Sequence, residues 1–287
     1  MQNFDRQYRL TAGVPGQTGF EVGAPGADGR ALRITFNLEK TTTQASNTGK
    51  ITVYNLNDEH KAILKEEKCV VQLSAGYGSV LYPIFLGDVK NPVETITNAD
   101  RGIEIEVFDG RTAFEVNISV AYEGVVLCQT VLTDIVTKMG IASTVYTESA
   151  KAAMVEKKYD NGYSFVGRGR EALTGVCDMC GLKYTIQNGV LQIYVTGETV
   201  SSRGYVLSPS TGLISIPSKV KISKDGQEFS GYEVTYFING AIGINDLVQL
   251  ESKYVSGTYW VYKQTYDGDN YSGDWTCKAQ LLEVKAK

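Results

Sequence analysis

The sequence predicts a mainly β protein of the α+β class, in which two small antiparallel β-barrels flank a helical α+β insert. Short alternating apolar segments separated by Gly and Asn turns fill residues 32–110. The apolar spacing becomes helical between about residue 112 and residue 181, and strand-like alternation returns after residue 200. We therefore expect three domains, at residues 1–115, 116–202 and 203–287.

The first barrel is predicted to open with a hairpin over residues 32–58. Both of its strands place apolar side chains on one face, namely Leu32, Ile34, Phe36, Leu38, Ile51 and Val53. The preceding stretch, 11–29, is rich in glycine, contains Pro15 and Pro25, and has few large apolar residues. It therefore predicts a long loop or arm that builds no core alone and becomes ordered against neighbours in an assembly.

A short helix and three more strands complete this barrel. Asp58 is predicted to cap a helix over residues 59–67, with Ala62 and Ile63 facing inward. Strands are expected within 70–78, 83–89 and 102–110.

The insert is predicted to contain two helices and a hairpin. Residues 125–140 place apolar side chains at helical spacing, at Val125, Leu132, Ile135, Val136 and Met139, before a terminating Gly140. A second helix is expected over 165–181, and Asn188-Gly189 predicts a two-residue hairpin turn within 182–195. Four strands, within 232–238, 246–252, 257–267 and 276–286, then form the second barrel.

Charge and hydropathy limit the possible functions. The 28 Lys and Arg residues are scattered among 32 Asp and Glu residues, which disfavours nucleic-acid recognition but suits a wall past which DNA slides without binding. No apolar run approaches the roughly 20 residues of a membrane span, so no membrane anchor is expected. The first residues lack a secretory signal, which predicts synthesis in the host cytoplasm.

The cysteines are expected to be free thiols, because they are odd in number and unevenly spaced: Cys69, Cys128, Cys177, Cys180 and Cys277. The Cys177-to-Cys180 spacing also occurs in zinc and redox sites. A zinc site needs further ligands, however, and the only histidine, His60, falls in another predicted domain. We interpret the two cysteines as structural helix positions and His60 as a solvated helix residue.

Three other groups have both a functional and a structural interpretation. Gly167 to Arg170 resembles part of a phosphate-binding loop, but without a preceding βαβ strand we interpret it as the approach to a helix. Asp267, Asp269 and Asp274 could bind calcium, but they lack an EF-hand register and favour a turn. The aromatic group could form a sugar-binding face, although core or interface positions take precedence: Tyr259, Trp260, Tyr262, Tyr266, Tyr271 and Trp275.

Two short signatures stand near opposite ends of the chain. The first is Tyr54-Asn55-Leu56, followed by the turn Ala75 to Gly78 and the strand Phe85 to Val89. The second is Gly268-Asp269 with Gly273-Asp274-Trp275. In this order they resemble the baseplate hub proteins of contractile-tailed phages, including tail proteins of the late-control type, over most of the chain. The sequence departs from that pattern at 11–29 and at 221–245, where the family's apolar strand pair is not expected here.

The resemblance implies a homotrimeric, structural baseplate hub of the virion, with no catalytic, metal-binding or cofactor-binding residues. Its two tube-like barrels per chain would give a pseudo-sixfold ring between a hexameric tail tube, or tube-initiator protein, and a trimeric spike. Other baseplate proteins would contact the ring, and DNA would pass through its lumen during ejection. Alternatives are a siphophage-type tail-tip protein, a carbohydrate-binding β-protein and a tail-tip hydrolase.

Overall fold

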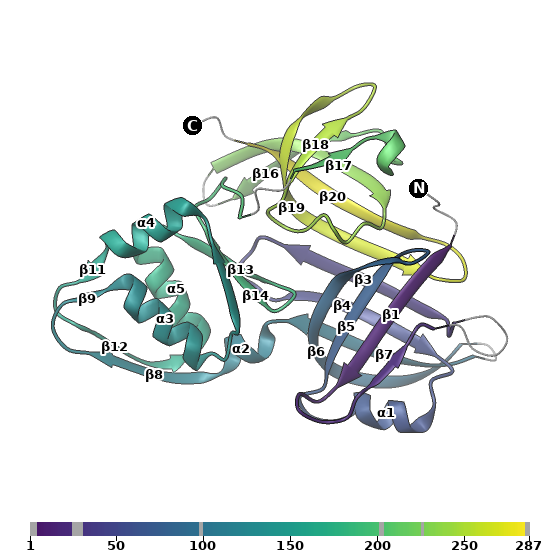
Figure 1. Cartoon of the computed structure of the whole chain (residues 1–287), viewed down its shortest axis with the longest axis horizontal. Helices are drawn as coiled ribbons and strands as arrows, with labels where there is room; N and C mark the ends of the chain where they lie inside the picture. Colours follow the sequence, from purple (N-terminus) through teal and green to yellow (C-terminus); the bar gives the residue numbers. More distant parts are fainter. Residues whose placement is uncertain (1–4, 25–30, 98–99, 201–203, 225–226, 285–287) are drawn as a thin grey trace.

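The computed structural model describes residues 5–24, 31–97, 100–200, 204–224 and 227–284 (Figure 1). Strands dominate and helices are few, so the predicted mainly β, α+β fold is confirmed. The strands of the large sheet are β1 (Arg6–Gly13), β2 (Phe20–Val22), β3 (Ile34–Thr41), β4 (Asn47–Tyr54), β5 (Val70–Tyr77), β6 (Val80–Thr97), β7 (Asp100–Asp109), β15 (Gly204–Leu207), β16 (Ser218–Lys224), β17 (Gln227–Phe237), β18 (Leu247–Glu251), β19 (Ser256–Asp269) and β20 (Trp275–Glu283). The helix α1 (Asp58–Leu64) follows β4, and the 3-10 helix η1 (Pro209–Thr211) follows β15.

The large sheet contains an internal repeat. We call β3 to β7 the first repeat and β16 to β20 the second repeat. In each, the first two strands form an antiparallel pair, the fourth strand pairs with the third and the fifth, and the fifth pairs with the second. The outer strands differ, because β1 pairs antiparallel with β5 whereas β15 pairs parallel with β18. That parallel pair is an exception to the predicted antiparallel pattern.

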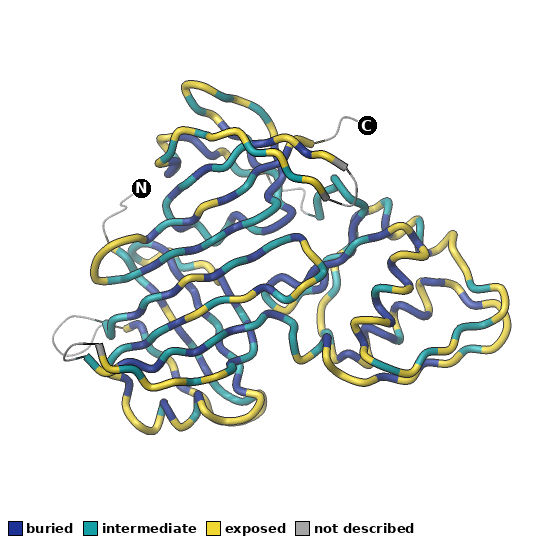
Figure 2. The backbone as a smooth tube through the Cα atoms, turned by 180° about the vertical axis from the view of Figure 1, so that it is seen from behind, coloured by how far each residue is buried: buried dark blue, intermediate teal, exposed yellow. Residues whose placement is uncertain are grey.

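The two repeats are joined directly. Strand β19 of the second repeat pairs antiparallel with β3 of the first, from Lys263 opposite Thr41 to Asp269 opposite Thr35. One buried apolar cluster extends through both repeats and includes Leu10, Ile105, Val248 and Leu281. Buried and exposed residues alternate along the strands (Figure 2), as expected when one face of a sheet packs on a core.

The insert lies beside the repeats (Figure 1) and has its own buried cluster. Its elements are α2 (Arg111–Glu115), β8 (Asn117–Tyr122), β9 (Val126–Leu127), α3 (Cys128–Lys138), β10 (Ser143–Tyr146), α4 (Glu148–Glu156), β11 (Lys158–Tyr159), β12 (Tyr163–Arg168), α5 (Gly169–Met179), β13 (Lys183–Gln187) and β14 (Val190–Tyr194). The predicted Asn188-Gly189 turn is confirmed, since both residues have positive φ between β13 and β14. Gly140 follows α3 with a φ of 72°, as predicted for a helix terminator.

The interpretation of residues 11–29 as a loop is wrong for part of its length. Residues 11–13 belong to β1, which pairs along β5, and 20–22 form β2, whose Phe20 is buried. Glycine permits the close approach of these strands, because a Cβ on Gly19 would lie 2.4 Å from the carbonyl oxygen of Ala12. Residues 25–29 lie outside the described residues.

Helix boundaries also differ from the expectations. Asn57, not Asp58, caps α1, because its side chain accepts a hydrogen bond from the backbone N–H of His60 at 2.8 Å. This shifts the buried face to Lys61 and Leu64 and leaves Ala62 exposed.

The predicted helices of the insert are shorter than expected. Helix α3 begins at Cys128, so Val125 precedes it and is 64% exposed. Residues 165–168 belong to β12, which pairs with β8, and α5 begins only at Gly169. Here sheet pairing overrides a helical apolar pattern. Helices α2 and α4 were not predicted.

Residues 221–245 do contain most of a strand pair, contrary to the expectation. Strands β16 and β17 are antiparallel, and Val220, Ile222 and Phe229 pack with Trp260 and Leu282 in a separate small cluster. The local pattern is weak, because Val220 and Ile222 are the only apolar residues among the lysines and serines of β16.

Candidate assembly surface

A polar sheet face crosses the joint between the repeats and extends from β17 to β6. One row of neighbouring residues crosses seven strands and consists of Phe237, Thr276, Asp267, Asn37, Lys50, Glu106 and Lys90. None of these side chains is buried. The next row points to the opposite side and is mainly apolar: Tyr236, Cys277, Tyr266, Leu38, Gly49, Val107 and Val89. We call the polar side the common face.

The common face is slightly acidic and its lysines are largely paired. It carries Lys50, Lys90, Lys263 and Lys278 against Glu39, Glu104, Glu106, Glu233, Asp267 and Asp269. Lys263 reaches across the joint between the repeats to Glu39 at 2.7 Å, and Lys50 lies 3.0 Å from Glu104. Such a surface offers no free row of cations to hold phosphates.

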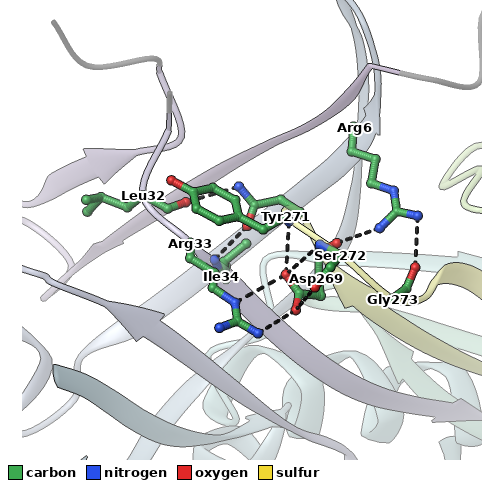
Figure 3. A network of polar contacts seen from close by, with 9 residues as sticks. Arg6, Leu32, Arg33, Ile34, Asp269, Tyr271, Ser272 and Gly273 are labelled. Carbon is green, nitrogen blue, oxygen red and sulfur yellow. Dashed lines mark hydrogen bonds and ion pairs between the residues drawn. The ribbon is translucent and has the colours of Figure 1, made fainter. Parts of the chain in front are cut away.

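The two sequence signatures meet at the joint between β19 and β3. Figure 3 shows the turn of the second signature, with Asp269 and Gly273 beside Arg33 and Arg6. The Asp269 carboxylate accepts a hydrogen bond from the Arg33 guanidinium at 2.7 Å, and the same guanidinium lies 4.9 Å from the centre of the Tyr54 ring. Arg6 donates to the backbone carbonyls of Asp269 and Gly273, both at 2.8 Å. Residues of the first signature, the second signature and β1 therefore form one polar cluster, which we call the joint cluster.

Asn270 extends the joint cluster to the strand before β3. Its side chain accepts from the backbone N–H of Ile34 at 2.8 Å and donates to the carbonyl of Leu32 at 3.1 Å. Asn270, Arg6 and Arg33 are not among the residues predicted from the sequence. Each is an ordinary polar residue at a strand end, and only the pairing of segments more than 200 residues apart gives it this role.

The ion pair at the joint holds a carboxylate in its charged form. Burial alone would raise the pKa of Asp269, but hydrogen bonds from Arg33 and from the backbone N–H groups of Tyr271 and Ser272 lower it below its usual value. The stabilisation is present above the unfolded pKa of about 4 and is lost as the pH falls through the lower folded pKa.

Asp269→Asn is therefore expected to lower the free energy of unfolding by about 1–2 kcal/mol at neutral pH. Urea unfolding of the unmodified protein and of Asp269→Asn, at neutral pH and near pH 3, measures the effect. The difference between their free energies of unfolding should become smaller in acid. Asp274→Asn is the matched control, because its side chain is exposed and should change little. A gap that stays constant with pH would contradict the assignment.

The rest of the second signature packs beneath this turn. Trp275 is 2% exposed, meets the Phe36 ring edge-on at 5.2 Å, and donates from Nε1 to the carbonyl of Gly76 at 3.2 Å. Gly268 leaves room for Phe36, because a Cβ there would lie 2.1 Å from the ring. These contacts join β20 and β19 to β3 and β5.

Three signature residues have local roles. Asn55 adopts a φ of 57° and donates its backbone N–H to the carbonyl of Arg101 at 2.7 Å. Leu56 is buried in the apolar cluster that extends through both repeats. The Asp274 carboxylate is exposed, while its backbone carbonyl accepts from the N–H of Asp269 at 2.9 Å.

The insert hairpin is held against the first repeat by buried polar groups. The Asp109 carboxylate, 1% exposed, accepts from the backbone N–H groups of Asn188 at 2.5 Å and Gly189 at 3.0 Å. Lys40 donates to the Asn188 side chain at 2.9 Å, and Asn47 donates to the carbonyl of Ile186 at 2.9 Å. Burial raises the pKa of Asp109 and lowers that of Lys40 to about 8.

The second repeat also contacts the insert hairpin. Asn245, which is fully buried, donates to the Gln192 side chain at 2.9 Å. Tyr194 donates to the carbonyl of Thr42 at 2.6 Å on the first-repeat side. The hairpin thus bridges the two repeats.

All five cysteines are free and buried, so they are available neither as exposed nucleophiles nor as surface ligands. Burial raises the pKa of the Cys69 thiol to about 11 and of Cys180 and Cys277 to about 12. Cys177 and Cys180 lie at the end of α5. The described residues contain no group of three or more His, Cys, Asp or Glu side chains arranged to hold a metal ion.

These thiols predict a loss of stability in alkali. In the unfolded chain they ionise near pH 9, whereas in the folded chain they keep their protons, so stability falls as pH rises. Between about pH 8 and about pH 10 each thiol contributes a loss of about 1 kcal/mol. Lys40 opposes this, because it loses its proton earlier in the folded chain.

Denaturant unfolding in the presence of reductant tests this alkaline effect. Cys277→Ala should show a fall smaller by about 1 kcal/mol over the same pH range, whatever its stability at neutral pH. An identical pH dependence in the variant would contradict the burial of an ionisable thiol.

The remaining candidate groups are structural. His60 was predicted to be a solvated helix residue, but it is half-buried and its ring stacks on that of Phe20 in β2, with ring centres 4.2 Å apart. Gly167 and Arg168 end β12, and Gly169 and Arg170 begin α5; β12 is antiparallel to β8, so no βαβ phosphate loop is formed.

The aromatic group divides mainly into core positions. Tyr259, Trp260, Tyr266 and Trp275 are buried, Tyr262 is half-buried, and Tyr271 is 53% exposed and donates to the carbonyl of Ala31 at 2.9 Å. Of the three aspartates, Asp267 hydrogen-bonds to Asn37 and Asp269 to Arg33, while Asp274 is exposed. The three do not converge on one point.

No protein-family model matches the sequence, and no curated protein matches it either. Solved structures do match. The 43 kDa tail protein of prophage MuSo2 from Shewanella oneidensis aligns with 96% of this chain and 98% of its own, at 12% identity and a TM-score of 0.60. A tail protein from Neisseria meningitidis aligns with 96% and covers 97% of its own chain, at 9% identity and a TM-score of 0.59.

This chain has the fold of phage tail proteins. The tail-protein fold also occurs in a type VI secretion component from Escherichia coli, described as structurally similar to the T4 tail proteins gp27 and gp5. It aligns with 96% of this chain and 77% of its own, at 8% identity and a TM-score of 0.59. The predicted resemblance to hub-type tail proteins is confirmed at the level of the fold. No helix in the described ranges is long and apolar enough to cross a bilayer.

Proposed function

We propose that this protein is a structural hub in the tail baseplate of a phage or a related injection particle. Three copies form a ring whose bore is lined by the common face. The observation that carries the proposal is the continuity of that polar face across both repeats through the β19–β3 pairing. The tail-protein fold supports it independently.

The internal repeat accounts for the proposed symmetry. Two repeats of one strand order per chain, taken three times, give six similar units around an axis. Such a ring matches a hexameric tail tube, or its initiator, on one side and a trimeric spike on the other. We retain 1–115, 116–202 and 203–287 as proposed domain boundaries, with the insert on the spike side and contacting other baseplate proteins.

We propose that the joint cluster and Trp275 are the signature residues' contribution to assembly. They fix the angle between the two repeats, because Arg33, Asp269 and Trp275 each contact the other repeat. Asp274 lies in the turn between β19 and β20, and Asn55 directly follows β4. A ring of six units closes only if this angle is held.

The role is proposed to be non-enzymatic and to belong to the virion. Trp260 and Trp275 are 1% and 2% exposed, which removes the surface tryptophans on which the carbohydrate-binding alternative depends. A purified sample should leave peptidoglycan intact in zymography. Clearing of the gel would favour the tail-tip hydrolase instead.

Electron microscopy of the intact tail tip tests the hub directly. Three copies around the axis, with the common face inward, are expected. A single copy, or a ring with β1 and β5 facing the bore, would contradict the proposal. The same images distinguish a contractile baseplate from a siphophage-type tip by the tail to which it is attached.

The charge of the common face gives a functional test. In a particle that carries DNA, Glu104→Lys combined with Glu106→Lys should slow DNA ejection severalfold, because added cations in the bore hold phosphates. Assembly should be preserved. The double change Glu148→Lys with Glu156→Lys, on α4 of the insert, is the control and should leave ejection unchanged.

A further inference from the structure

The row of strands that carries the common face ends in two edges that no strand of the described chain covers. At one end, β16 pairs with β17 only. At the other, β5 reaches only Asp88 of β6, so beyond Lys90 this strand pairs with β7 alone. Unpaired strand edges present free N–H and C=O groups that template another strand.

The internal repeat shows which strand fits the β6 edge. Strands β6 and β19 occupy the same position in their repeats, and both contain a bulge midway, between Lys90 and Val93 and between Val261 and Lys263. In each, the first half pairs with the preceding strand and the second half with the following one. Only β19 uses the other side of its second half, to pair with β3.

Strand β3 is the first strand of its repeat, and β16 is the first strand of the other. The joint inside the chain is therefore the fourth strand of the second repeat against the first strand of the first repeat. The reverse combination, β6 against β16, is absent within one chain because the two edges lie at opposite ends of the row.

We infer that the second half of β6 in one copy pairs antiparallel with β16 of the next copy, repeating the geometry of the β19–β3 joint. This inference rests on the proposed hub and names its subunit interface. Each chain then contributes β16, β17, β20, β19, β3, β4, β7 and β6 to one closed sheet. The interface is heterologous, which produces a ring when the rotation closes.

The repeat also fixes the register. Val93 and Lys263 are the first paired residues after the two bulges, so they are equivalent positions in the two repeats. The row of paired neighbours through Val93 reaches Thr35 in β3, and the row through Lys263 reaches Ser218 in β16, so Thr35 and Ser218 are equivalent as well. In the β19–β3 joint Lys263 pairs with Thr41, and the same pairing between the equivalent residues of β6 and β16 places Ile96 opposite Lys221 of the neighbouring copy. Thr95 is placed opposite Ile222.

The exposed side chains on the two edges agree with such a partner. Ile96 is 76% exposed and Val93 is 55% exposed, although both stand on a strand of the sheet. Lys219 and Lys221 are exposed on β16, whereas Glu94 on β6 is already paired with Lys61 at 3.5 Å and Lys65 at 2.7 Å of its own chain. Pairing β16 with a second β16 would bring lysines together, whereas pairing with β6 places Lys221 beside the apolar Ile96, so self-pairing is disfavoured.

Cysteine cross-linking tests the interface on the full chain. Ile96→Cys and Lys221→Cys are made in separate, differently tagged chains, both at exposed positions, while the five native thiols are buried. Mild oxidation of the mixture should give a mixed dimer, whereas neither chain alone should. The double variant should give a band of three chains. Thr95→Cys with Ile222→Cys provides a second pair on the other side of the sheet.

The control pairs Lys221→Cys with Thr48→Cys, which is exposed in β4 within the row and should not cross-link. Light scattering of the unmodified chain separates the possible failures. A trimer without the mixed dimer overturns the β6–β16 interface and leaves the hub standing. A strict monomer at high concentration overturns both, and a cross-linked ring of another size supports the interface but contradicts the trimer.

Discussion

Trp275→Ala is expected to lower the free energy of unfolding by about 3–5 kcal/mol, the range for removing a buried aromatic side chain. The indole is 2% exposed, and its loss leaves a cavity beside Phe36 and removes the donor to the carbonyl of Gly76. Because β20 belongs to the second repeat and β3 and β5 to the first, the cavity opens between the repeats. Chemical unfolding followed by tyrosine fluorescence measures the loss.

Trp260→Ala is the matched control for this change. Trp260 is 1% exposed but packs with Phe229 and Leu282 within the second repeat, so it should lose similar stability without loosening the joint. Hydrogen exchange of β3 amides should therefore rise in Trp275→Ala and not in Trp260→Ala. Equal exchange in both variants would contradict a role for Trp275 in joining the repeats.

Asp109→Ala is expected to cost about 3–5 kcal/mol, because it removes one partner from a buried charged network. The change leaves the backbone N–H groups of Asn188 and Gly189 without their acceptor and Lys40 without the nearby carboxylate. The insert hairpin should then detach more readily from the first repeat. Denaturant unfolding gives the magnitude, and exchange of the amides of residues 188 and 189 gives the location.

Asp109→Asn keeps the shape and one acceptor oxygen, so it should lose distinctly less stability than alanine. A control elsewhere on the hairpin is Gln192→Ala, which removes the contact to Asn245 of the second repeat. It should raise exchange in the hairpin without affecting Lys40. If Asp109→Ala unfolds like the unmodified protein, the hairpin does not depend on this carboxylate.

The common face shows which features of the sheet the alternation of apolar residues predicts and which it does not. Alternation in 32–40 and 50–58 predicted β3 and β4 and their buried sides correctly, because a period of two is local and needs no partner. In 257–267 it predicted a strand, but Tyr259, Trp260 and Val261 are all buried because a bulge interrupts the alternation. Nothing local indicates that β19 pairs with β3. That pairing alone turns two separate polar faces into one.

The errors have a similar cause. The glycine-rich stretch 11–29 was predicted to be a loop or arm, yet its residues 11–13 and 20–22 form strands against β5 and α1. Residues 165–168 follow a helical apolar spacing but pair with β8. In each case a tertiary neighbour outweighed the local preference.

The sequence by itself determined the fold class, the order of sheet, insert and sheet, the Asn188-Gly189 turn and the lack of a cationic row, since each follows from local periodicity, turn chemistry or charge count. Only the tertiary structure decided that the first repeat matches the second, that Arg6, Arg33 and Asn270 meet Asp269's turn, and that two strand edges stay open. These depend on contacts between residues far apart in the chain, whose register is set by packing and is not written in any short segment.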